Sequence, residues 1–186
     1  MKKYITKLIL ASGLLMITQS CEAQKVVVNR EVETTSDGKM LLGTQTVSQF
    51  EKAPYDSWYK QGKEEYQINA EAIEGLKKQK FKTYAITVFL GTWCEDSHRD
   101  FPRFMKIVEA TGFPEDKLTI ITVNRKKESP DGEEAQLNIQ RVPTFIVSRY
   151  GKEIGRIIEF PTSGYLEKDL LEILKKDDSS IKDIFK

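Results

Sequence analysis

The sequence predicts an α/β fold in which a mixed central sheet is flanked by helices. From about residue 69 onward, short apolar runs rich in β-branched residues alternate with amphipathic helical segments, and only a short turn separates the last two predicted strands. The 186 residues, 39% of them apolar, suffice for one ordinary core. We therefore expect a single α/β domain preceded by a leader and an N-terminal extension.

Residues 1–21 have the three-part layout of a secretory signal peptide. A basic start is followed by an apolar run, Leu8 to Ile17, which is roughly half as long as a membrane-spanning helix requires. We favour processing as a lipoprotein with Cys21 lipidated, because a small residue precedes this cysteine in a loose lipobox. The alternatives are cleavage after Ala23 and a chance cysteine in a discarded leader.

Residues 22–68 are predicted to form the N-terminal extension. Lys25 to Gly43 suggests a small hairpin with a turn at Asp37-Gly38. Residues 44–67 are polar and rich in aromatic side chains, so we expect irregular structure and a short helix packed against the main domain. The aromatic side chains could form a box for a ligand, but packing is the favoured use.

The main domain, residues 69–176, is expected to start with a helix, a buried strand and a second helix. Asn69 can cap the first helix, over 69–80, and the apolar run 84–90 predicts the strand. The second helix begins at residue 94 or 95 and runs to about 110. We expect Pro102 to kink it, because proline lacks the N–H needed for one bond of the helix.

The remainder of the domain continues the alternation of strands and helices. Its predicted elements are a strand over 118–123, a short helix over 131–137, a strand over 144–148, a turn over 150–152, a strand over 153–158 and a helix over 165–176. The two strands around the turn are expected to pair as a hairpin. Residues 177–186 are predicted to be a frayed polar tail.

Cys94 is placed where the predicted strand gives way to the second helix. At such a junction unpaired backbone N–H groups and the helix dipole favour a thiolate. Ser97 occupies the position where a two-cysteine redox motif carries its second sulfur, so the site is C-x-x-S. Cys94 could form a mixed disulfide with another molecule but could not resolve it internally.

The chain has two cysteines, and Cys94 is the one that the folded domain keeps. Cys21 is either acylated or removed with the leader, so no internal disulfide is expected. In an oxidising compartment, a lone cysteine is either buried and inert or kept for reaction. Of the 29 basic residues, three lie in the leader, which leaves 26 against 28 acidic ones and gives no reason to expect a nucleic-acid partner.

Three segments resemble the thioredoxin superfamily. Residues 93–97 are similar to its W-C-x-x-C signature with the last cysteine replaced, residues 138–145 look like its segment ending in a cis-proline, and residues 151–156 resemble the hairpin and glycine that follow. The resemblance covers about residues 69–176 in the right order. It is nearest to exported bacterial thioredoxin-like proteins with a G-T-W-C-x-D-S site, and it implies a thioredoxin fold.

The resemblance also implies roles for individual residues. Cys94 would be the attacking sulfur and Pro143 the cis-proline beside it, although the sequence also fits a plain turn at Pro143. Val142 would offer its backbone to an extended substrate peptide by strand-like pairing. Trp93 would form a flat apolar wall of the same groove.

Departures from the superfamily pattern concern the residues around the thiol. Val88 stands where dithiol thioredoxins usually carry a buried acid, which is consistent with a site that has no second thiol. Ser97 could hydrogen-bond the Cys94 thiolate or cap the helix. Glu95 and Asp96 disfavour a thiolate by their charge, although both also suit the start of a helix.

His98, the only histidine, follows Cys94 by one helical turn. It could hydrogen-bond the sulfur or shuttle a proton, or it could be an exposed helix residue. We expect no metal, because thioredoxin-fold copper chaperones use two cysteines with the histidine. A peroxidase of the peroxiredoxin type is disfavoured, since Gly91 holds the place of its threonine.

The favoured function is a monothiol thiol-disulfide oxidoreductase or isomerase-like protein of the bacterial cell envelope. Cys94 would form mixed disulfides with client proteins or small thiols, and an external thiol would release the product. No cofactor is expected, and contact with the membrane would be only through lipidated Cys21, in the periplasm or at the outer surface. The alternative is a redox-inactive binding or chaperone-like module that keeps the groove.

Overall fold

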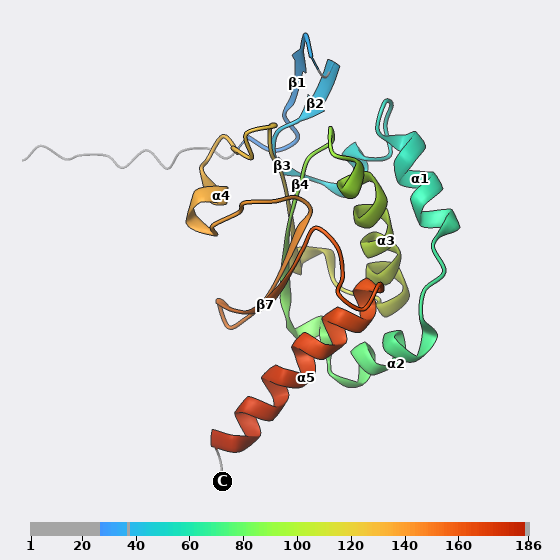
Figure 1. Cartoon of the computed structure of the whole chain (residues 1–186), viewed down its shortest axis with the longest axis vertical. Coiled ribbons are helices and arrows are strands. Elements are labelled where there is room, and N and C mark those ends of the chain that lie inside the picture. The colour runs from blue at the N-terminus through green and yellow to red at the C-terminus, as the bar shows by residue number, and fades with distance from the viewer. Residues whose placement is uncertain (1–26, 37, 185–186) are drawn as a thin grey trace, which may run out of the picture.

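The computed structural model describes residues 27–36 and 38–184 of the chain (Figure 1). The predicted leader, Cys21, the start of the predicted hairpin and Asp37 lie outside these residues. The strands are β1 (Glu31–Thr34), β2 (Gly38–Leu41), β3 (Gly43–Gln45), β4 (Ala85–Leu90), β5 (Leu118–Thr122), β6 (Thr144–Arg149) and β7 (Lys152–Ile158). The α-helices are α1 (Asp56–Glu65), α2 (Ala70–Lys78), α3 (Glu95–Thr111), α4 (Glu133–Gln136) and α5 (Leu166–Ile184).

The central sheet is mixed and has the strand order β3-β5-β4-β6-β7. β4 and β5 are parallel, and every other neighbouring pair in this sheet is antiparallel. Such a sheet joined by helical crossovers confirms the predicted fold class. β1 and β2 pair separately as the hairpin expected before residue 43.

Each face of the sheet carries its own core, because successive side chains of a strand point to opposite faces. α1, α2, α3 and α5 lie on one side of the sheet, and α4 lies on the other (Figure 1). The larger, helical-face core includes Val88, Phe101 and Ile120. The smaller core, here the site-face core, consists of Phe89, Ile121, Val123, Ile139, Val142 and Ile146, with Trp93, Cys94 and Leu137 packed against it.

The helices of the main domain begin and pack largely as the sequence predicts. The Asn69 side chain accepts a hydrogen bond from the Ala72 amide at 2.9 Å and so caps α2. Pro102 is buried inside α3, facing α1. A Cβ atom at Gly62 would lie 2.5 Å from the Pro102 ring, so the glycine allows α1 and α3 to pack closely.

The extension contributes more to the domain than the sequence predicts. β3 pairs antiparallel with β5 and forms one edge of the central sheet, and α1 packs on α3. β3 and α1, which lie before residue 69, are thus part of the same packed unit as the elements that follow. β3 has only three residues and no apolar alternation, so its place is decided by pairing with a strand distant in the sequence.

The predicted polar tail is instead helical, because α5 continues to Ile184. Asp177 accepts hydrogen bonds from the Tyr84 hydroxyl at 3.2 Å and from Arg149 at 2.8 Å. These contacts tie the helix to the end of the sheet beyond the predicted stop at residue 176. In the part of the chain that the structure describes, no helix is both long and apolar enough to cross a membrane.

Candidate functional site

Cys94 lies at the junction of β4 and α3, as the sequence predicts. It is the N-cap residue of α3, with extended backbone angles of φ −106° and ψ 121°. Its N–H donates to the Gly91 carbonyl and its carbonyl accepts from the His98 N–H, both at 3.0 Å. The turn that holds the sulfur is therefore fixed by backbone hydrogen bonds on both sides.

The thiol faces the loop that precedes β6. Cys94 is partly exposed, and its Sγ donates to the Val142 carbonyl at 3.5 Å. The peptide bond between Val142 and Pro143 is cis, as the resemblance implies. The structure thus brings together the sulfur and the loop that were expected to share a groove.

Trp93 is half-buried beside the thiol and is held by two contacts. Its indole N–H donates to the Val123 carbonyl at 2.8 Å, and the Arg125 guanidinium lies 5.1 Å from its ring centroid. The ring also covers Gly91, where a Cβ atom would lie 2.6 Å from it. Gly91 therefore leaves room for the orientation that Trp93 adopts next to Cys94.

Ser97 is fully buried, and its hydroxyl accepts a hydrogen bond from the Gly91 N–H at 3.2 Å. Among the described residues, no hydrogen bond joins Ser97 to the Cys94 sulfur. The structure therefore gives the serine a positioning contact, which holds the first residue of the turn against α3. Neither the thiolate bond nor the N-cap weighed from the sequence describes this arrangement.

The His98 side chain is partly exposed at the cavity described below, and among the described residues no hydrogen bond joins its ring to the Cys94 sulfur. Its Nε2 lies 2.8 Å from the Thr92 carbonyl, to which it donates, and its ring stacks on Trp58 with centroids 4.4 Å apart and planes 15° apart. The Thr92 hydroxyl in turn accepts from the Leu41 N–H at 3.3 Å. His98 thereby joins the extension to the turn that carries Cys94.

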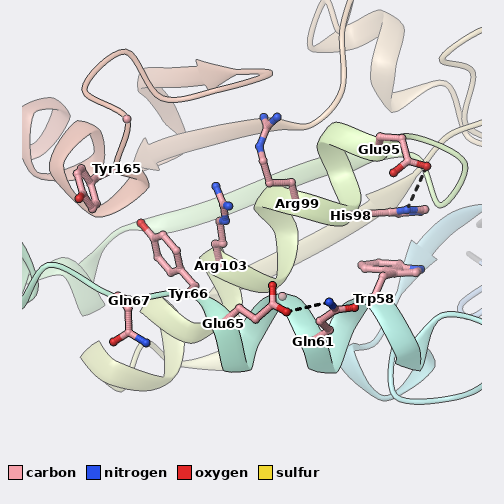
Figure 2. A pocket seen from close by; sticks show the side chains of 12 residues that line it. Trp58, Gln61, Glu65, Tyr66, Gln67, Glu95, His98, Arg99, Arg103 and Tyr165 are labelled. Atoms are coloured by element: carbon pink, nitrogen blue, oxygen red, sulfur yellow. Dashed lines mark hydrogen bonds and ion pairs between the residues drawn. The ribbon is translucent and has the colours of Figure 1, made fainter.

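A cavity of about 720 Å³ opens along α3, starting at the residue after Cys94 (Figure 2). α3 supplies one wall, α1 and the segment after it supply the opposite wall, and the residues just before α5 close one end. The lining residues are Trp58, Gln61, Gly62, Glu65, Tyr66, Gln67, Glu95, His98, Arg99, Arg103, Gly164 and Tyr165. This cavity could not be predicted from the sequence, because its walls come from three distant segments.

Two arginines on the α3 wall are held by carboxylates of the same helix. Asp100, only 1% exposed, accepts from Arg99 at 2.7 Å and from Arg103 at 3.3 Å, and Asp96 accepts from Arg99 at 2.7 Å. The hydrogen bonds with Asp100 and the charges of both carboxylates raise the pKa of Arg99. Neither aspartate lines the cavity, so they anchor the guanidinium groups from outside it.

Tyr66 forms part of the opposite wall and is fixed by a buried acid. Its hydroxyl donates to Glu167 at 2.7 Å, and Glu167 is fully buried. Burial raises the pKa of Tyr66 well above its ordinary value, and the hydrogen bond with Glu167 adds to this effect. The Arg103 guanidinium lies 5.2 Å from the Tyr66 ring centroid, so the two walls meet at this point.

No protein-family model matches the chain, and no curated protein matches it. Among solved structures, it is similar to a protein of unknown function from Pseudomonas aeruginosa, with 17% identity and a TM-score of 0.52 over 69% of this chain and 87% of that chain. An HIV epitope scaffold gives 16% identity and a TM-score of 0.51 over the same shares. The similarity to these two structures concerns the fold alone.

Mitochondrial thioredoxin 3 from Saccharomyces cerevisiae, in its oxidised form, is 26% identical, with a TM-score of 0.35 over 51% of this chain and 83% of that chain. In this chain, the mixed sheet of order β3-β5-β4-β6-β7, the helix that begins after Cys94 and the cis-proline loop facing the sulfur form the arrangement that the sequence resemblance implies. The chain has a thioredoxin fold.

Among the described residues, no group of three or more acidic, histidine or cysteine side chains is arranged to hold a metal ion.

Proposed function

We propose that the protein carries out thiol-disulfide exchange through Cys94 alone. The observation that supports this most directly is the placement of a partly exposed thiol at the start of α3, 3.5 Å from the carbonyl that precedes the cis-proline. Cys94 is the one free cysteine of the described residues. A serine or any small apolar residue would pack at this junction equally well.

The proposed reaction is a single disulfide exchange. The Cys94 thiolate attacks one sulfur of a client disulfide, a bond forms between the two sulfurs, and the original disulfide breaks and releases the other sulfur as a thiolate that takes a proton from water. An external thiol then attacks the mixed disulfide and regenerates Cys94. Ser97 lacks a sulfur and its hydroxyl holds Gly91, so it would act by positioning the turn.

Val142, Pro143 and Trp93 are proposed to bind the client beside the thiol. The Val142 carbonyl is already within reach of the sulfur, so an extended client segment that crosses this loop would present its disulfide to Cys94. The half-buried Trp93 ring would pack against the same segment. His98, bonded to Thr92, would support the turn rather than exchange protons with the sulfur.

Reaction of the purified protein with glutathione disulfide tests this function, with the mixed disulfide detected by mass spectrometry of the intact chain. In proteins that start at Gln24 and therefore lack Cys21, the chain with Cys94 should gain one glutathione adduct, which dithiothreitol removes, and Cys94→Ala should gain none. Circular dichroism of both proteins controls for folding. A chain with Cys94 that forms no adduct over hours at pH 8 would contradict the proposal.

The second candidate function is that of a redox-inactive binding module. It is favoured by the size of the cavity along α3, whose lining does not include Cys94. In that case partners should be retained by Cys94→Ala and lost when lining residues such as Trp58 are replaced. Pull-down with both variants separates the two functions.

We further propose that the protein is exported and anchored in the cell envelope by lipidated Cys21, with envelope proteins as clients. The basic and apolar layout of residues 1–21 and the small residue before Cys21 support this. Incorporation of labelled palmitate into the wild type, and none into Cys21→Ala, is the expected result. Label in both proteins, or in neither, would contradict lipidation at this residue.

A further inference from the structure

The cavity along α3 starts next to the thiol and continues away from it. Glu95, which follows Cys94, and His98 line one end, and Arg103 lines the cavity farther along the helix (Figure 2). From Glu95 to Arg103 the helix rises by about 12 Å. An extended polypeptide covers this distance in about four residues. The cavity is therefore within reach of residues close in sequence to a cysteine that reacts with Cys94.

The α3 wall presents guanidinium N–H groups beyond those that bind the carboxylates of the same helix. Arg103 takes part in one hydrogen bond among the described residues, to Asp100, although a guanidinium has five N–H groups. Its side chain is 34% exposed, and that of Arg99 is 39% exposed. Figure 2 shows both side chains extending from α3 in the same direction. Such a planar fork suits a carboxylate, which it can bind through two parallel hydrogen bonds.

The two acidic residues that line the cavity have partners other than the two arginines. Glu65 accepts from Gln61 at 2.8 Å on the α1 wall, and Glu95 lies 3.9 Å from His98 at the end nearest Cys94. The carboxylates that contact the arginines, Asp96 and Asp100, are outside the lining. Beyond Glu95, the charged groups of the α3 wall that line the cavity are the guanidinium groups of Arg99 and Arg103.

The remaining walls fit a peptide better than a small inorganic anion. Tyr66 and Tyr165 provide aromatic surface, and Gln61 and Gln67 provide amide groups of the kind that pair with a peptide backbone. The volume of about 720 Å³ lies in the range of sites that hold ligands much larger than a single ion. Several residues of an extended chain could be accommodated.

We propose that this cavity binds the acidic flank of the client polypeptide, with a carboxylate about four residues from the client cysteine bound by Arg103. This inference rests on the proposed exchange reaction at Cys94 and adds a sequence preference to it. The cavity selects the client, and the sulfur then undergoes the exchange described above.

Symmetric disulfide dimers of short peptides test the preference. One pair of peptides carries Glu or Gln four residues after the cysteine, and a second pair carries Glu or Gln four residues before it. For the pair that runs in the productive direction, the Glu peptide should form the mixed disulfide with Cys94 about fivefold faster than its Gln counterpart. Rates with free 2-mercaptoethanol correct for intrinsic reactivity of each peptide.

Arg103→Gln should remove the advantage of the Glu peptide, and Arg103→Lys should keep only part of it, because lysine retains the charge and loses the fork. Lys77→Gln is the matched control, because Lys77 lies on α2 outside the cavity, and it should keep the full advantage. Equal rates for Glu and Gln peptides in both directions, or an advantage that survives in Arg103→Gln, would overturn the proposal.

A binding measurement separates this proposal from the redox function. The Glu peptide with Ser in place of its cysteine is titrated calorimetrically into the Cys94→Ser protein, where no exchange can occur. An affinity for the Glu peptide about fivefold higher than for the Gln peptide supports the cavity proposal, even when no peptide disulfide reacts. Equal affinity of both peptides, or no binding of either, contradicts it even when exchange with glutathione disulfide proceeds.

Discussion

The two faces of the central sheet differ in size and in what they carry. The helical-face core is covered by four helices, whereas the site-face core consists of six buried residues against which Trp93 and Cys94 pack. Adjacent residues of one strand, such as Ile120 and Ile121, belong to different cores. The larger core therefore supplies most of the stability, and the smaller one positions the chemistry.

Replacing each of these two isoleucines by alanine should produce the largest changes in the free energy of unfolding, and these changes should differ between the two positions. Ile120→Ala should lower the free energy of unfolding by about 4 kcal/mol and Ile121→Ala by about 2 kcal/mol, because the small core has fewer neighbours around the cavity left behind. Urea unfolding of both variants measures the difference. We expect Ile121→Ala, but not Ile120→Ala, to slow exchange at Cys94. If both variants lost the same free energy of unfolding, or Ile121→Ala lost more, the two cores would not differ as described.

A smaller loss of stability is expected at the turn between β4 and α3, which carries Cys94. Ser97→Ala leaves the buried Gly91 N–H without its acceptor and should cost about 1–2 kcal/mol. It should also slow mixed-disulfide formation, because the turn around Cys94 loses a contact. Ser57→Ala, a change at an exposed serine, serves as the control in the same unfolding experiment. An unchanged exchange rate in Ser97→Ala would show that this contact does not position the thiol.

The smallest effect concerns α4, which lies on the side of the smaller core. Burial acts to raise the pKa of Glu134, but hydrogen bonds from the Ser129 hydroxyl and amide outweigh it and lower this pKa. A lowered pKa stabilises the folded state above the unfolded value of about 4.3, and this stabilisation is lost as the pH falls through the folded pKa.

Since Glu134 is only partly buried, solvent screens its contacts, and Glu134→Gln should cost no more than about 0.5 kcal/mol at pH 7. Chemical unfolding of wild type and variant at pH 7 and at pH 3 measures the change. The difference between the two proteins should disappear at the lower pH. A difference that grows on acidification would reverse the sign assigned to this carboxyl.

Much of the fold from residue 69 onward could be predicted from local patterns. The apolar run 84–90, the apolar stripe of the long helix after Cys94 and the turn of the final hairpin are local signals, and each predicts an element that is present in the structure. β3 could not be predicted, since three residues carry no period and their strand exists through pairing with β5. The helical end of α5 depends on Asp177 and its contacts with distant Tyr84 and Arg149.

The candidate site could be predicted in part for the same reason. The thiol and the proline loop are marked by short motifs, so Cys94, Val142 and Pro143 were expected to lie together, and the sulfur does contact the loop. The partner of His98 could not be predicted, because Trp58 comes from a segment forty residues earlier in the chain. The cavity could not be predicted, since it exists only where α1, α3 and the residues just before α5 meet.

Thr92 has a practical consequence for how the protein can be shortened. Its hydroxyl binds Leu41 of the hairpin while its carbonyl binds His98, so one residue connects the leading segment to the turn around Cys94. A chain that starts after residue 43 would resemble a minimal thioredoxin-like domain, yet it would lack the strand that holds this turn. An N-terminal truncation made for expression should therefore stop before the hairpin.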